Sequence, residues 1–299
     1  MVAALTLDGI SKRYGGFQAV SDLSFQVEKG SICGFLGPNG AGKTSTLRMI
    51  LGLQPATSGR IDILGADDGR KVRDRIGFLP EERGLYKKMT PVDAIAFFGG
   101  LKGLPLPEGR RRGREMLEQM GLGEASKKKM KELSKGMAQK VQLIASVVHQ
   151  PEFVILDEPF SGLDPMNQQG LEAMIRALAD NGATVLFSTH VMQHAERLCD
   201  KVVLLARGRK AFEGTVDEAR AIAEGEGASE LCIIGGGEIF RQLLDQASDL
   251  YLTWVDAEVP ADTHFPEVDV QDWREVSSEP HPADDRHAYA FRFVHYVRR

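Results

Sequence analysis

Cysteine, tryptophan and long apolar runs are scarce in this 299-residue chain. The three cysteines, Cys33, Cys199 and Cys232, are too widely spaced for a disulfide framework or a paired metal-ligand motif, a pattern typical of a reducing compartment. No stretch approaches the roughly 18 consecutive apolar residues of a membrane span, and the start, MVAALTLDGISKRYGG, has no basic region followed by an apolar core. We therefore expect a chain without a membrane span, which a partner would have to anchor.

Internal repeats and low-complexity tracts are also absent from the sequence. The one basic cluster, SKKKMK at residues 126–131, is short and is better explained as a solvated face than as a nucleic-acid patch. We expect no nucleic-acid partner.

The net charge of −5 conceals a break in composition. Residues 1–214 hold 30 Lys and Arg against 24 Asp and Glu, a charge of +6, whereas residues 215–299 hold 7 against 18, a charge of −11. Every lysine lies at or before Lys210, and both tryptophans, Trp254 and Trp273, lie in the acidic part. This shift predicts two domains, residues 1–214 and 215–299, with a junction at about 214–220.

A phosphate-binding motif stands in the first part, in SICGFLGPNGAGKTSTLRMILGL. An apolar strand, a G-x-x-x-x-G-K-[ST] turn and a helix beginning near Lys43 follow one another, which is the context that a P-loop requires. Backbone N–H groups and the helix dipole would bind phosphate, Lys43 the β- and γ-phosphates, and the Thr44 hydroxyl Mg²⁺. The predicted nucleotide-binding residues are Gly37, Pro38, Asn39, Gly40, Ala41, Gly42, Lys43, Thr44 and Ser45.

Two carboxylates follow a second apolar strand, in PEFVILDEPFSGLDP. Carboxylates at the C-terminal end of a buried parallel strand face the crevice where such sheets bind ligands. Asp157 is the expected Mg²⁺ ligand, and Glu158 the general base that would deprotonate the attacking water. An ordinary strand-end turn is the alternative for an isolated Asp-Glu pair, but the P-loop upstream argues against it.

Two further features flank this strand. Ser134 is a plausible N-cap of a helix whose apolar residues recur at Val141, Ile144, Ala145 and Val148. His190 follows a strand that ends near Thr189, so it could reach the γ-phosphate and the attacking water.

The order and spacing of these motifs over about residues 3–220 resemble the ATP-binding cassette (ABC) ATPases. The resemblance implies an α/β P-loop fold with a RecA-like core and a helical signature subdomain. LSKGM at 133–137 is similar to the LSGGQ signature, which implies that Ser134 and Gly136 contact the γ-phosphate bound by the opposite subunit. SGLD resembles the D-loop and gives Asp164 a place at the dimer interface. Tyr14 looks like the aromatic that stacks on adenine, with a half-buried strand tyrosine as the alternative.

Two motifs depart from the family pattern. Glu81 stands where the family usually has a glutamine, and its carboxylate could still approach Mg²⁺ or water. Lys135 and Met137 replace a glycine and a glutamine of the signature. LPEERGLY and LSKGM together resemble one branch of the bacterial export-type subunits.

The resemblance implies a Mg²⁺-dependent ATPase in which two cassettes, most simply a homodimer, close head to tail over two ATP molecules. Their closure and reopening would drive a separate membrane permease, which would hold the chain at the cytoplasmic face of the membrane. A soluble ABC ATPase that regulates another complex without transport is the alternative, and co-purification of a multispanning protein would distinguish the two.

The remainder of the chain resembles a different family. From VDEARAIAEGEGASELCIIGGGEIFRQLL to HAYAFRFVHYVRR, it is similar to the second half of dihydrofolate reductase, and the two resemblances overlap around residues 213–221. The reductase resemblance implies an NADPH side and, at Thr253, a pterin contact; three glycines before a helix can also be a plain turn. The implied NADPH contacts are Gly235, Gly236, Gly237, Glu238, Ile239 and Phe240.

The first half of the reductase, including the carboxylate that protonates the substrate, has no counterpart before Glu213. We therefore expect a partial α/β reductase-like segment that does not reduce dihydrofolate, because half a domain exposes strand edges and half a core. A bifunctional or NADPH-binding fusion is the alternative. The origin remains open between a natural fusion, a recombination at the shared TVDEA and an artificial joining, with a chimera near 214–220 favoured.

Overall fold

The computed structural model describes residues 2–82, 84–161, 163, 165–215, 218, 244, 247–255, 257, 268, 272–283 and 289–299. The chain divides into two compact units, Met1–Gly227 and Ala228–Arg299. The junction predicted at about 214–220 stays a prediction.

The first unit contains a six-stranded sheet in the order β5-β6-β7-β3-β8-β9. All neighbours are parallel except the pair β8 and β9. The central strands are buried on both faces, as expected where a parallel sheet is covered by helices. The strands are β3 (Ile32–Leu36), β5 (Ile76–Leu79), β6 (Phe153–Asp157), β7 (Thr184–Thr189), β8 (Lys201–Ala206) and β9 (Arg209–Gly214).

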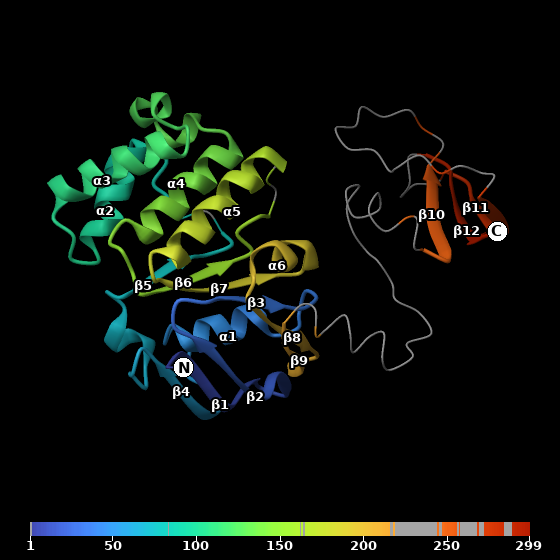
Figure 1. Cartoon of the computed structure of the whole chain (residues 1–299), viewed down its shortest axis with the longest axis horizontal. Helices are drawn as coiled ribbons and strands as arrows, with labels where there is room; N and C mark the ends of the chain where they lie inside the picture. Colours follow the sequence, from blue (N-terminus) through green and yellow to red (C-terminus); the bar gives the residue numbers. More distant parts are fainter. Residues whose placement is uncertain are drawn as a thin grey trace. The chain divides into compact units, whose positions relative to one another are not determined.

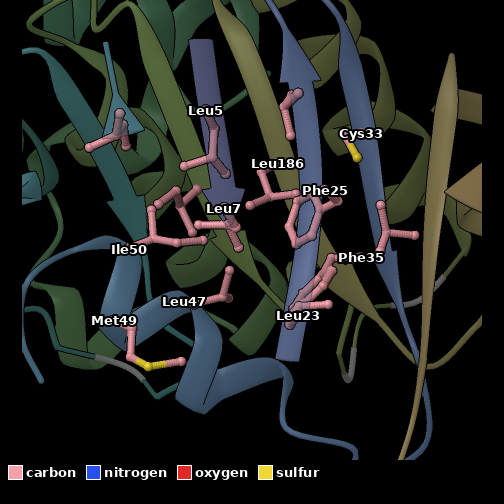
Figure 2. Packing of buried hydrophobic residues seen from close by; sticks show 14 of the residues in the cluster. Leu5, Leu7, Leu23, Phe25, Cys33, Phe35, Leu47, Met49, Ile50 and Leu186 are labelled. Atoms are coloured by element: carbon pink, nitrogen blue, oxygen red, sulfur yellow. The ribbon is translucent and has the colours of Figure 1, made fainter. Parts of the chain in front are cut away.

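A second sheet, antiparallel and ordered β2-β1-β4, lies on the other side of helix α1 from the parallel sheet (Figure 1). Its strands are β1 (Ala3–Tyr14), β2 (Phe17–Glu28) and β4 (Ser58–Ile63), and α1 spans Lys43–Ile50. Figure 2 shows the apolar core between these layers, to which Leu47 of α1, Leu7 of β1 and Leu23 of β2 belong. In this core the Phe25 and Phe35 ring centroids lie 5.4 Å apart. Burial of this one face of α1 is what holds the P-loop that precedes it.

The opposite face of the parallel sheet is covered by α4, α5 and α6 (Figure 1). A third cluster joins α2, α3 and α4 and contains all four periodic residues that predicted the signature helix, Val141, Ile144, Ala145 and Val148. The helices are α2 (Pro91–Gly100), α3 (Leu106–Gln119), α4 (Lys135–Val147), α5 (Pro165–Asp180) and α6 (Met192–Leu198). None of the helices among the described residues has the length and apolar character to cross a bilayer.

A reciprocal pair of hydrogen bonds follows β9 in the first unit. The Thr215 amide donates to Glu218 Oε2 at 2.8 Å, and the Glu218 amide donates to Thr215 Oγ1 at 3.1 Å. This is a capping box of the T-x-x-E type, and it begins directly after β9.

The second unit contains a three-stranded antiparallel sheet in the order β10-β12-β11. Its strands are β10 (Asp249–Val255), β11 (Trp273–His281) and β12 (Phe291–Arg298). Leu250, Trp273 and Val294 are buried, whereas Tyr251 and Phe293 are largely exposed. The described part of the second unit thus has few buried side chains.

A histidine at the end of α4 predicts a pH-dependent stability. Burial of the His149 ring lowers its pKa to about 4, and the nearby Lys102 cation acts in the same direction. In the unfolded chain the pKa of His149 is about 6.5, so below this pH the unfolded chain binds a proton there, whereas the folded chain binds it only near pH 4. The stability that is present near neutral pH is therefore lost as the pH falls from about 6.5 to about 4. Allowing for partial solvent screening, we expect a loss of about 1 kcal/mol by about pH 5. Urea unfolding should show a smaller loss for His149→Gln; equal losses would contradict the assignment.

Candidate nucleotide site

The P-loop runs from the end of β3 to the start of α1, and two of its glycines are required by their surroundings. Gly37 (φ 154°) lies where a Cβ would come within 2.6 Å of the Leu205 carbonyl oxygen, and Gly42 (φ 101°) where a Cβ would lie 2.6 Å from the Ala19 carbonyl oxygen. α1 has no side-chain cap, so its first-turn N–H groups have no side-chain oxygen bound to them. The loop therefore has the close-packed backbone and the open helix end that a phosphate needs.

Substitution at Gly42 should be costly for the fold. Gly42→Ala combines a left-handed backbone with a backbone clash, whereas Gly40→Ala has a left-handed backbone (φ 80°) and open space around it. We expect Gly42→Ala to lower the free energy of unfolding by about 1–3 kcal/mol more than Gly40→Ala does. Urea unfolding of both variants measures the difference, and equal midpoints would show that the Ala19 contact relaxes freely.

Lys43 is the first residue of α1 and is buried. Its Nζ donates to the Gly37 carbonyl oxygen at 2.6 Å and lies 3.6 Å from Glu158 Oε1. The cation is thus held inside the loop, beside the carboxylate predicted to be the base.

Asp157 ends β6 and is paired with Ser188 of β7, whose hydroxyl donates to Asp157 Oδ1 at 2.5 Å. Burial raises the pKa of the Asp157 carboxyl, while hydrogen bonds from Ser188 and from Thr44 oppose that rise. Thr44 and Asp157, two of the three residues predicted to hold Mg²⁺, therefore lie close enough for the Thr44 hydroxyl to lower the pKa of Asp157.

Glu158 has a left-handed backbone (φ 48°), which is costly for a residue with a Cβ. Its amide bonds Ser188, to the carbonyl at 3.1 Å and to the hydroxyl at 3.2 Å, and these bonds hold the turn. Its Oε1 lies 3.0 Å from His190 Nδ1. The structure thus brings Lys43, Glu158 and His190 together at the C-terminal edge of the parallel sheet.

Tyr14 ends β1 and is 43% exposed, and Lys12 Nζ lies over its ring, 5.2 Å from the ring centroid. Its hydroxyl donates to Gln54 Oε1 and approaches Ser45 Oγ at 3.5 Å. The ring therefore lies near the first turn of α1, where a nucleotide base could reach it; stacking on adenine stays a prediction.

Ser134 is confirmed as the N-cap of α4, since its hydroxyl accepts a hydrogen bond from the Met137 amide at 3.2 Å. A Cβ at Gly136 would come within 2.8 Å of Asn167 Nδ2, so this glycine allows α4 to approach α5. Ser134 and Lys135 are exposed, as a surface that meets a second subunit would need to be.

Glu81 lies just beyond β5, next to the strand that ends in Asp157, and is exposed. Among the described residues there is no group of three or more His, Cys, Asp and Glu side chains placed to hold a metal ion. The metal contact of Glu81 stays a prediction.

Several other predicted residues lie outside the described part of the chain. They are Asp164, Gly235, Gly236, Gly237, Glu238, Ile239 and Phe240. Thr253, the predicted pterin contact, lies exposed on β10.

The sequence reasoning missed Ser188 and two glutamines on the buried face of α4. Gln139 Nε2 donates to the Pro159 carbonyl at 3.3 Å, in the turn after β6. Gln142 Nε2 donates to the Glu82 carbonyl at 3.2 Å, in the loop after β5. Helix α4 is thus hydrogen-bonded to the loops that follow β5 and β6. These two glutamines lie three positions apart, and so on the same face of the helix, among apolar residues. That pattern is the sequence signal that could have indicated buried polar contacts.

His194 was also missed. Its buried ring stacks on Phe160 with centroids 4.1 Å apart, and its Nδ1 lies 3.5 Å from Glu172 Oε1. Burial lowers the pKa of His194, with Glu172 acting the other way. This packing joins α6, which follows His190, to the turn that follows Glu158.

These residues fit a nucleotide with Mg²⁺. The loop has no room for a Cβ at Gly37 or Gly42, and the Lys43 cation lies against the Gly37 carbonyl. Thr44 and Asp157 supply the hard oxygen ligands that Mg²⁺ prefers. A parallel sheet with this loop and these strand-end carboxylates defines a P-loop nucleotide-binding protein.

Comparison with known proteins narrows this class. A family model described as ABC transporter matches residues 20–161, and one described as dihydrofolate reductase matches residues 200–298. An uncharacterized ABC transporter ATP-binding protein, YhaQ of Bacillus subtilis (strain 168), is 42% identical over 72% of this chain and 72% of its own length. The linearmycin resistance ATP-binding protein LnrL of the same organism is 35% identical over 79% and 77%.

Solved structures agree with these relatives. The structure of the ATP-binding subunit of an ABC transporter superposes with a TM-score of 0.68 and 31% identity, covering 81% of this chain and 99% of that one. The chain belongs to the family of ABC transporter ATP-binding proteins.

The reductase match has a separate consequence. It begins at residue 200, so it includes β8 and β9, which are strands of the parallel sheet of the first unit. The two family-model matches do not overlap, since one ends at residue 161 and the other begins at residue 200.

Proposed function

We propose that the chain is the Mg²⁺-dependent ATPase subunit of a transporter of export type, acting on a separate membrane permease. The observation that carries the proposal is the convergence of Lys43, Glu158 and His190 at one sheet edge, with Glu158 3.6 Å from the lysine and 3.0 Å from the histidine. Relatives named for linearmycin and daunorubicin resistance support the export assignment.

In this proposal each residue has one task. Lys43 binds the β- and γ-phosphates, and Glu158 accepts the proton of the attacking water while His190 holds its carboxylate in place. When bound by Thr44 and Asp157, Mg²⁺ would neutralise charge on the phosphate oxygens. Two copies would close head to tail, so that Ser134 and Gly136 of one meet the nucleotide of the other. The permease would then hold the chain at the cytoplasmic face of the membrane.

Two measurements test this function. Phosphate release from ATP should require Mg²⁺ and cease when EDTA is added. A multispanning membrane protein should co-purify from detergent-solubilised membranes. Hydrolysis without any such partner would instead favour a regulatory ATPase.

We further propose that the reductase-like tail, residues 215–299, does not reduce dihydrofolate, because the catalytic first half of the reductase has no counterpart in the sequence. Absorbance at the NADPH band should stay constant when the purified chain is given NADPH and dihydrofolate. A dihydrofolate-dependent decrease would overturn this and support the bifunctional alternative.

A further inference from the structure

The outer edge of β10 is an open strand edge within the described part of the tail. Among the described residues, the sheet order β10-β12-β11 leaves β10 hydrogen-bonded to β12 alone. An open edge offers a row of free N–H and C=O groups, so natural proteins usually protect it with charges or proline.

The two edges of this sheet differ in that protection. β11, with the sequence WREVSSEPH, carries Arg274, Glu275, Glu279 and Pro280. β10, with the sequence DLYLTWV, has no proline or lysine and only one charge, Asp249, whose carboxylate lies 2.7 Å from His295 Nε2. Tyr251 and Val255 are 70% and 52% exposed. Of the two edges of the described sheet, β10 thus carries less protection in its own sequence.

The register identifies which backbone groups point outward. Arg298 N donates to the Ser248 carbonyl at 2.8 Å, and hydrogen-bonded pairs alternate with non-bonded pairs along an antiparallel ladder. The even-numbered residues of β10 therefore bond β12. The N–H and C=O groups of the odd-numbered residues, Asp249, Tyr251, Thr253 and Val255, point away from it.

This pattern is self-complementary. If two β10 strands pair antiparallel about a two-fold axis at Leu252, Tyr251 lies opposite Thr253 of the second copy, and Asp249 lies opposite Val255. Every residue with outward groups then meets another such residue, and the single carboxylate meets an apolar side chain rather than its own copy. Leu250 lies opposite Trp254, an aromatic–aliphatic pair of the stabilising kind.

We propose that β10 is a self-association surface, and that two copies of this chain pair through it into a continuous six-stranded antiparallel sheet. The pairing does not depend on nucleotide. Because tail and cassette are one polypeptide, it also raises the effective concentration of one cassette around the other.

The test is the mass of the full chain, measured by light scattering after size exclusion in EDTA without nucleotide, over a dilution series. Wild type should run as a dimer that dissociates on dilution. Thr253→Pro should be a monomer, because it removes an outward N–H without breaking a bond to β12. Thr253→Val, which keeps that N–H, should remain a dimer. A monomeric wild type, or a dimeric Thr253→Pro, would overturn the proposal.

A second measurement guards against misfolding of the proline variant. Hydrogen exchange of wild type should show the Tyr251 and Thr253 amides protected at high protein concentration and exchanging freely on dilution, while even-numbered β10 amides stay protected throughout. Odd-numbered amides that exchange freely at every concentration would also overturn the pairing.

Discussion

Glu158→Gln is expected to bind ATP yet lose almost all turnover, by about 10²–10⁴-fold, because an amide cannot accept the proton of the attacking water. The substitution keeps the size of the side chain and removes a negative charge 3.6 Å from Lys43. Nucleotide affinity should therefore be kept or increased. Steady-state phosphate release and equilibrium nucleotide binding measure the two effects separately.

Glu152→Gln is the matched control for this variant. Glu152 is an exposed carboxylate that pairs with Arg75, with Oε1 2.6 Å from the guanidinium Nε. The control should hydrolyse ATP at the wild-type rate. If Glu158→Gln did the same, the base would have to be another group, and His190 would be the first to examine.

Lys43→Ala is expected to weaken ATP binding by about 10–100-fold, which is the loss of a charge-assisted hydrogen bond of about 1.5–3 kcal/mol. Affinity is lost because Lys43 is buried beside two carboxylates, and removing its cation leaves Asp157 and Glu158 as uncompensated negative charges beside the incoming phosphates. Calorimetric titration with a non-hydrolysable ATP analogue gives the affinity.

An exposed lysine provides the comparison. Lys71, paired with Asp67 at 2.6 Å on the surface, can be changed to alanine without touching the P-loop. Lys71→Ala should bind the analogue as wild type does. Equal affinities for Lys43→Ala and wild type would mean that the loop amides alone hold the phosphates.

The local elements were predictable because their signals are short-range. β3, the start of α1 at Lys43, the end of β6 at Asp157 and the Ser134 cap all lie where the pattern of apolar and small residues predicted them. A strand buried on both faces needs an apolar run, and a cap needs a hydroxyl at one position. Such requirements can be read from a few adjacent residues.

The contacts that complete the site were not predictable in this way. Ser188 lies 31 positions from Asp157, and His194 touches Phe160 across a similar separation. Neither serine nor histidine at these positions has a sequence signature, because its role exists only once β6 and β7 pair and α6 packs on the sheet. The left-handed backbone of Glu158 is likewise held by bonds to the neighbouring strand.

By itself the sequence determined the P-loop, the buried strand that ends at Asp157 and the change of charge and composition near residue 214, because glycine spacing, apolar runs and charge are properties of adjacent residues. Only the tertiary structure decided that Lys43, Glu158 and His190 meet at one edge, and that the outer edge of β10 carries no strand within the described tail. The reason is physical: a hydrogen bond or a strand pair between distant residues depends on which elements the whole chain brings side by side.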